Sequence, residues 1–83
     1  MLNDNRLGRF QIGIDVINDA PEIVTRIMGE TIILRAEALL SNKAIEYHAI
    51  CEHFEELPDG MMLPEYDVIY DGETDKITWA KSE

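Results

Sequence analysis

Apolar residues alternate with mostly polar or small residues along the segment from residue 10 to residue 17. The apolar positions of this segment are Phe10, Ile12, Ile14 and Val16. An alternation with a period of two residues is typical of a β-strand that buries one face. The pattern therefore predicts a first strand over Phe10 to Ile17.

The spacing of apolar residues becomes helical after Pro21. Residues three and four positions apart are apolar in this segment, namely Ile23, Val24, Ile27 and Met28. Pro21 suits the first turn of a helix, and Asn18 and Asp19 before it are of the types that cap helices. Gly29 is a typical end. We expect a short helix between Pro21 and Gly29.

The segment 31–54 fits two structures. Its Ala, Leu and Glu content favours a helix. A hairpin that turns at Ser41-Asn42 instead places four apolar pairs on one face: Ala38 with Ile45, Ala36 with Tyr47, Leu34 with Ala49 and Ile32 with Cys51. Glu37 would then face Glu46 and repel it. We favour the hairpin because tertiary pairing often overrides propensity. The alternative, with residues 31–55 helical, is a mostly helical domain with a C-terminal β-hairpin.

The last third of the chain predicts a second hairpin. Pro58-Asp59-Gly60 is typical of a turn, and residues 66–70 alternate as in a strand. A four-residue loop over 72–75 would pair Tyr70 with Ile77 and Val68 with Trp79. On this strand face we expect Tyr66, Tyr70 and Trp79 to belong to the core.

Together these elements predict an α+β fold in the order β-α-β-β-β-β, with one helix packed on one face of an antiparallel sheet. The length of 83 residues predicts a single domain over 1–83, in which we expect residues 1–8 to be flexible. A domain of this size buries only about 60% of its unfolded surface. A core shared with a second copy is one way to gain stability.

Cysteine usage and the start of the chain bear on its location. Cys51 is the single cysteine, so it has no partner for an internal disulfide. Residues 1–7 contain no apolar signal-peptide core, and Arg35 and Glu37 interrupt the longest apolar stretch. We therefore expect a cytoplasmic protein without a membrane segment.

The charge is distributed unevenly. Residues 1–43 hold six acids and five bases, a net of −1, whereas residues 44–83 hold eleven acids and two bases, a net of −9. The strongly negative charge of residues 44–83 disfavours direct binding to nucleic acid. It favours a protein partner with a basic surface, which includes a nucleic-acid-binding complex. The residues that we expect to contact this partner are Glu52, Glu55, Glu56, Asp59, Met61, Met62, Glu65, Asp67, Asp71 and Glu73.

Metal-ligating residue types occur together only in the segment 48–53, as His48, Cys51, Glu52 and His53. On a strand His48 points away from Cys51, and on a helix His53 leaves the shared face. A Cys–His nucleophile pair would also need an orienting group and an oxyanion site, for which the sequence gives no motif. The sequence thus predicts no catalytic residue, no metal, no cofactor and a buried Cys51.

In its small size, acidity and lack of a catalytic motif, the chain is similar in general character to phage or mobile-element proteins that block host nucleic-acid-binding machinery. Anti-CRISPR proteins and anti-restriction DNA mimics are examples, and the resemblance is one of composition. It implies a non-enzymatic inhibitor or adaptor. One alternative is a homo-oligomeric structural or assembly protein that associates through an edge strand or through Met61 to Leu63. Another is a small-ligand binder or enzyme around His48 and Cys51.

Overall fold

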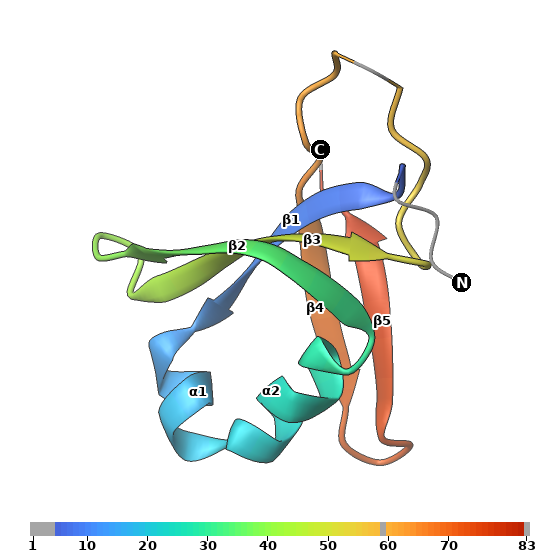
Figure 1. The fold of residues 1–83 in the computed structure, drawn as a ribbon. Helices are drawn as coiled ribbons and strands as arrows, with labels where there is room; N and C mark the ends of the chain where they lie inside the picture. The colour runs from blue at the N-terminus through green and yellow to red at the C-terminus, as the bar shows by residue number, and fades with distance from the viewer. Residues whose placement is uncertain (1–4, 59, 83) are drawn as a thin grey trace.

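Two antiparallel sheets and two short helices make up the part of the chain that the computed structural model describes, residues 5–58 and 60–82 (Figure 1). The elements are β1 Leu7–Gly13, α1 Ile14–Asp19, α2 Pro21–Met28, β2 Thr31–Leu39, β3 Ala44–Cys51, β4 Tyr66–Asp71 and β5 Lys76–Lys81. The expected α+β class is confirmed. Neither helix of the described residues is long and apolar enough to cross a membrane.

β1 is shorter at its C-terminal end than the expected strand over residues 10–17. It begins at Leu7 and ends at Gly13, which faces Ala44, the first residue of β3. The next backbone N–H, of Ile14, donates to the Lys43 carbonyl at 2.9 Å, and no strand of the described residues pairs with the chain beyond it. The chain therefore turns into α1, so the expected strand is wrong from Ile14 onward.

Two helices stand where one was expected. The helix from Pro21 is confirmed as α2, with Pro21 in its first turn and Gly29 as the residue that ends it. Asn18 and Asp19 do not cap it: they lie in α1, and the cap position is Ala20, without a side-chain hydrogen bond. Both helices lie on the same side of the three-stranded sheet (Figure 1).

The hairpin over residues 31–54 is confirmed, and the helical alternative for residues 31–55 is wrong. Ala38 faces Ile45 and Ala36 faces Tyr47, as expected. A β-bulge between Ile33 and Arg35 then shifts the register by one residue. The structural pairs beyond it are Ile33 with Ala49 and Ile32 with Ile50, so the expected pairs of Leu34 with Ala49 and Ile32 with Cys51 are wrong.

β4 and β5 form the second hairpin in the expected register, with Tyr70 facing Ile77 and Val68 facing Trp79. They do not continue the first hairpin as a meander of four strands, because β3 has β1 on one side and β2 on the other. With both edges of β3 occupied, residues 52–65 carry the chain past β1. There the Arg9 N–H donates to the Pro64 carbonyl at 3.0 Å, and the two-stranded sheet begins.

The segment expected to be flexible, residues 1–8, overlaps β1. Leu7 and Gly8 face Ile50 and Ala49 of β3. Residues 1–4 lie outside the described part of the chain. The ordered sheet therefore starts within the expected flexible segment.

Aromatic rings join the two sheets. Trp79 of β5 contacts Phe10 of β1 with ring centroids 5.0 Å apart and Phe54 with centroids 5.2 Å apart. Phe54 also stacks on Tyr66 of β4 at 4.1 Å. Gly8 makes room for that stack, because a Cβ there would lie 2.8 Å from the Tyr66 ring. Tyr66 is buried in the core, as predicted, while Trp79 and Tyr70 are partly buried and pack against that core.

Replacing Phe54 with alanine should remove about 3–5 kcal/mol from the free energy of unfolding, because the fully buried ring leaves a cavity. Urea denaturation followed by tryptophan fluorescence measures the change. Ile69→Ala on β4 is the control: Ile69 is 52% exposed, so its loss should cost less than about 0.5 kcal/mol. Equal losses in the two variants would contradict the assigned core.

Candidate interaction surface

β2 is exposed along almost its whole length although most of its residues are apolar. Every residue from Ile32 to Ala38 is exposed, and Leu34 keeps 55% of its surface in solvent. β2 is also an edge strand, hydrogen-bonded to β3 alone. One row of its backbone N–H and C=O groups thus has no strand partner among the described residues, and such a row can pair with another chain.

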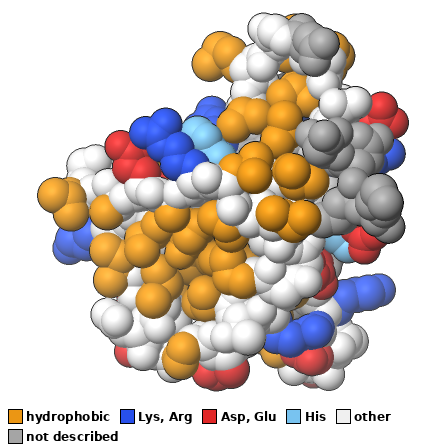
Figure 2. Space-filling view, in the orientation of Figure 1, with side chains coloured by type: hydrophobic (Ala, Val, Ile, Leu, Met, Phe, Trp, Pro, Cys, Tyr) orange, Lys and Arg blue, Asp and Glu red, His pale blue; other side chains and the backbone are white. Residues whose placement is uncertain are grey.

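The apolar side chains near β2 continue onto one face of the molecule. Figure 2 shows hydrophobic side chains gathered below β2, over the sheet and the helices. Val24 and Met28 of α2 and Tyr47 of β3 pack on the core but are only partly buried. The six and eight residues of the two helices are too few to cover the whole sheet. An exposed apolar area next to a free edge is typical of an interaction site.

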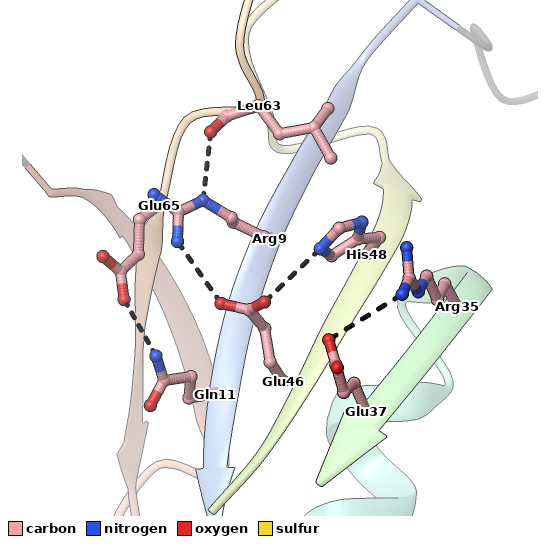
Figure 3. A network of polar contacts seen from close by, with 8 residues as sticks. All are labelled: Arg9, Gln11, Arg35, Glu37, Glu46, His48, Leu63 and Glu65. Carbon is pink, nitrogen blue, oxygen red and sulfur yellow. Dashed lines mark hydrogen bonds and ion pairs between the residues drawn. The ribbon is translucent and has the colours of Figure 1, made fainter. Parts of the chain in front are cut away.

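The opposite face of the same sheet is polar, and ion pairs join its side chains (Figure 3). Glu46 of β3 has one carboxylate oxygen 3.3 Å from the Arg9 guanidinium and the other 3.4 Å from the His48 ring nitrogen. Arg9 also donates to the Leu63 carbonyl at 3.1 Å. Through Arg9, the polar face therefore links β1 and β3 to the connection that leads to β4.

Glu37 faces Glu46 as the sequence predicted, and the ion pairs of this face offset the repulsion. Glu46 is bound by Arg9 and His48, while Glu37 lies 3.9 Å from Arg35 on its own strand. Arg35 and Glu37 are both exposed. The polar side of β2 therefore presents one positive and one negative side chain, two residues apart, to anything that approaches its edge.

β5, the outer strand of the second sheet, is better protected than β2 against pairing with another chain. Lys76 and Lys81 lie at the two ends of β5, and lysines on an edge strand oppose pairing with other chains. β2, with the sequence TIILRAEAL, contains neither lysine nor proline. The features of β2 that oppose such pairing are the bulge between Ile33 and Arg35 and the charged pair Arg35 and Glu37.

The acidic residues predicted to bind a partner lie in two groups. Glu55 and Glu56 belong to the connection 52–65, and Asp71 and Glu73 lie at the tip of the β4–β5 hairpin (Figure 1). The six residues of β4 separate the two groups by about 20 Å. Glu65 and Asp67 lie at the start of β4, nearer the first group.

Several of these acids already have partners within the chain. Glu55 lies 3.1 Å from Lys81, and Glu56 lies 3.5 Å from Arg6. Further contacts are Glu52 with His53 at 3.9 Å, Gln11 with Glu65 at 3.4 Å, Ser82 with Asp67 at 3.3 Å and the Glu73 N–H with Asp71 at 2.9 Å. Basic side chains thus reduce the negative potential around the connection.

Met61 and Met62 are exposed, with 86% of Met62 in solvent, while Leu63 is half-buried. Asp59, the remaining predicted contact, lies outside the described residues. The Met61 N–H donates to the Pro58 carbonyl at 3.3 Å, and Gly60 has a positive φ of 81°. The two methionines therefore sit on a turn at one end of the molecule, away from β2 (Figure 1).

His48 and Cys51 are not brought together. His48 binds Glu46 on the polar face, whereas Cys51 is completely buried, as predicted, and belongs to the core. Burial raises the pKa of the Cys51 thiol, and the negative charges of Glu30 and Glu52 raise it further. Within the described residues, no three His, Cys, Asp or Glu side chains lie close enough together to hold a metal ion.

A cavity of about 420 Å³ lies between β1, the helices and β4. Its lining is apolar apart from Gln11 and Tyr70. Both polar side chains have partners, since Gln11 donates to Glu65 at 3.4 Å and Tyr70 donates to Asp75 at 2.7 Å. The cavity therefore offers a ligand no polar side chain that lacks a partner.

The exposure of β2 was not predicted from the sequence, because the apolar side chains of this strand were expected to pair with those of the next strand on one face of the hairpin. Ile32, Ile33 and Leu34 are consecutive, and three consecutive apolar residues on a strand cannot all point to one face. Together with a position at the sheet edge, this run is the signal of an exposed apolar strand.

The β2 surface offers backbone hydrogen-bonding groups, apolar side chains and one pair of opposite charges. This combination suits the binding of another polypeptide strand. Comparison of the chain with protein-family models, curated proteins and solved structures finds no match.

The raised pKa of Cys51 makes stability depend on pH. As the pH rises through about 8.5, the unfolded chain loses the thiol proton before the folded chain does. Loss of this proton stabilises the unfolded chain, so the free energy of unfolding falls. The difference in unfolding free energy between the natural chain and Cys51→Ala should therefore shrink between about pH 7.5 and about pH 9.5. Urea denaturation at both values measures it, and a constant difference would contradict the assignment.

Proposed function

We propose that this chain is a non-enzymatic protein-binding module that contacts its partner through β2. The observation that carries the proposal is the exposure of Ile32, Ile33 and Leu34 on a strand with a free edge. In the corresponding binding mode, a partner strand adds to the sheet: backbone hydrogen bonds give affinity, and side chains of alternate residues give specificity.

The energetics of the exposed strand support this proposal. Removing apolar surface from water stabilises by roughly 25 cal/mol per Å², so the apolar side chains of β2 favour any state in which they are covered. Because unpaired edges also promote aggregation, proteins commonly blunt them with charges, prolines or bulges. β2 has only its bulge and the pair Arg35 and Glu37, which leaves an edge able to accept a selected partner.

A second candidate function is that of an inhibitor or adaptor that presents acidic residues to a basic surface of a protein partner, as anti-defence nucleic-acid mimics do. The formal charge of −10 and the exposed Asp71 and Glu73 at the hairpin tip favour it. The ion pairs of Glu55 with Lys81 and Glu56 with Arg6 weigh against the connection as part of such a surface. On balance the β2 surface is the stronger candidate.

The β2 proposal predicts that Leu34→Asp loses binding partners that the natural chain keeps. We expect this because a carboxylate at the contact would have to be desolvated. The measurement is capture from lysate by the tagged protein, including capture of untagged copies of the same chain. Ile69→Asp is the matched control, since Ile69 on β4 is 52% exposed and Leu34 is 55% exposed.

A partner retained by Leu34→Asp with unchanged yield would contradict the β2 proposal. Capture at high salt separates the two candidates, because attraction between exposed charges is screened whereas strand pairing and apolar contacts persist. Loss of the partner at high salt and in a Glu73→Lys variant, with no effect of Leu34→Asp, would support the acidic surface instead.

A further inference from the structure

We propose that the occupant of the β2 edge is β2 of a second copy of this chain, paired antiparallel about a two-fold axis that passes beside Ala36. This inference rests on the proposed function and names the partner. The two three-stranded sheets would join into one sheet of six strands. In such a symmetric contact each copy presents the same surface patch.

The sequence of β2 determines which register can form. A two-fold axis normal to the sheet keeps each face on its own side, and directly opposed residues of antiparallel strands point to the same face. Residues of the polar face, Arg35 and Glu37, must therefore oppose polar-face residues of the second copy. The axis then passes beside a residue of β2 rather than between two residues.

Charge complementarity selects among these registers. With the axis beside Arg35, two arginines would oppose each other, and with the axis beside Glu37, two glutamates would do so. With the axis beside Ala36, Arg35 of each copy opposes Glu37 of the other, which gives two opposite-charge pairs. In the single copy these two side chains lie only 3.9 Å apart and exposed, so both are available for this exchange.

The other face of β2 fits the same register. Ala36 meets Ala36 at the axis, where a small side chain allows close approach, and Leu34 lies next to Ala38 of the second copy. Each copy thus covers part of the exposed Leu34 of the other. The bulge between Ile33 and Arg35 lies beside the central pairs and leaves residues 35–37 regular.

The other strands offer less suitable edges. The outer side of β1 is approached by the start of β4, where Arg9 donates to the Pro64 carbonyl and bridges to Glu65. β5 has Lys76 and Lys81 at its ends. β5 contains no acidic residue, so the pairing of two β5 strands forms no opposite-charge pair between residues 76–81, whereas the pairing of two β2 strands forms two.

Sedimentation equilibrium of the full chain tests the association. The natural chain should show a dimer of two 9.5 kDa copies that dissociates on dilution. Glu37→Arg should weaken the dimer by about tenfold or more, because two opposite-charge pairs become two like-charge pairs. The exchange Arg35→Glu with Glu37→Arg should restore it, because both pairs return with their signs reversed.

A matched control removes the effect of net charge. Glu73→Arg makes the same charge change at the hairpin loop, far from β2, and should dimerise as the natural chain does. The variants should also fold, since Glu37 is exposed and an arginine there would face Glu46. Circular dichroism of each variant checks this.

Disulfide cross-linking tests the register. In a Cys51→Ala background, Ala36→Cys should form a disulfide between copies on oxidation, because directly opposed Cα atoms lie about 4.5–5.5 Å apart. Ala38→Cys is the matched control. In this register the two copies of residue 38 are displaced by four residues, about 13 Å along the strand, and cannot be bridged.

A monomer at all concentrations, a dimer indifferent to Glu37→Arg, or cross-linking of Ala38→Cys in place of Ala36→Cys would each overturn the inference. None of these results decides the proposed function. A monomer whose captured partner is lost in Leu34→Asp would keep β2 as the binding surface and assign it to another protein.

Discussion

The packing of Trp79 between Phe10 and Phe54 is the contact on which the rest of the structure depends. It fixes the β4–β5 hairpin against β1 and the start of the connection 52–65, where Phe54 lies, and Tyr66 stacks on Phe54. The buried core therefore lies on the β1 side of the three-stranded sheet, and no residue of β2 belongs to it. The exposure of β2 follows from this asymmetry: β2 is held by its hydrogen bonds to β3 while the aromatic core forms elsewhere.

Local pattern predicted the hairpins of this fold and failed where a distant partner decides the structure. The β4–β5 register was predictable because a four-residue loop fixes which residues face each other. Ile14 and Val16 continued a strand pattern, yet β3 begins opposite Gly13, so a longer β1 would have no partner strand in the part of the chain that the structure describes. Likewise, no local sequence pattern predicts the bulge beside Leu34. The separate sheet of β4 and β5 forms because β1 and β2 occupy both edges of β3.

The candidate site was harder to predict than the fold. Charge counts pointed to the C-terminal half, but they could not show that Glu55 and Glu56 meet Lys81 and Arg6. The apolar residues of β2 suggested a buried strand, because the sequence alone does not show which strand of a sheet lies at its edge. The buried Cys51 was predictable, because a lone cysteine without a catalytic setting usually packs as a small hydrophobic residue.

Amide hydrogen exchange along β2 at two protein concentrations, about a hundredfold apart, tests most directly whether this edge pairs with a second copy. We expect the backbone amides of β2 to exchange more slowly at the higher concentration, while those of β5, which begins with Lys76 and ends with Lys81, do not change. Exchange of the β2 amides at the same rate at both concentrations, or slowing confined to β5, would contradict pairing through β2.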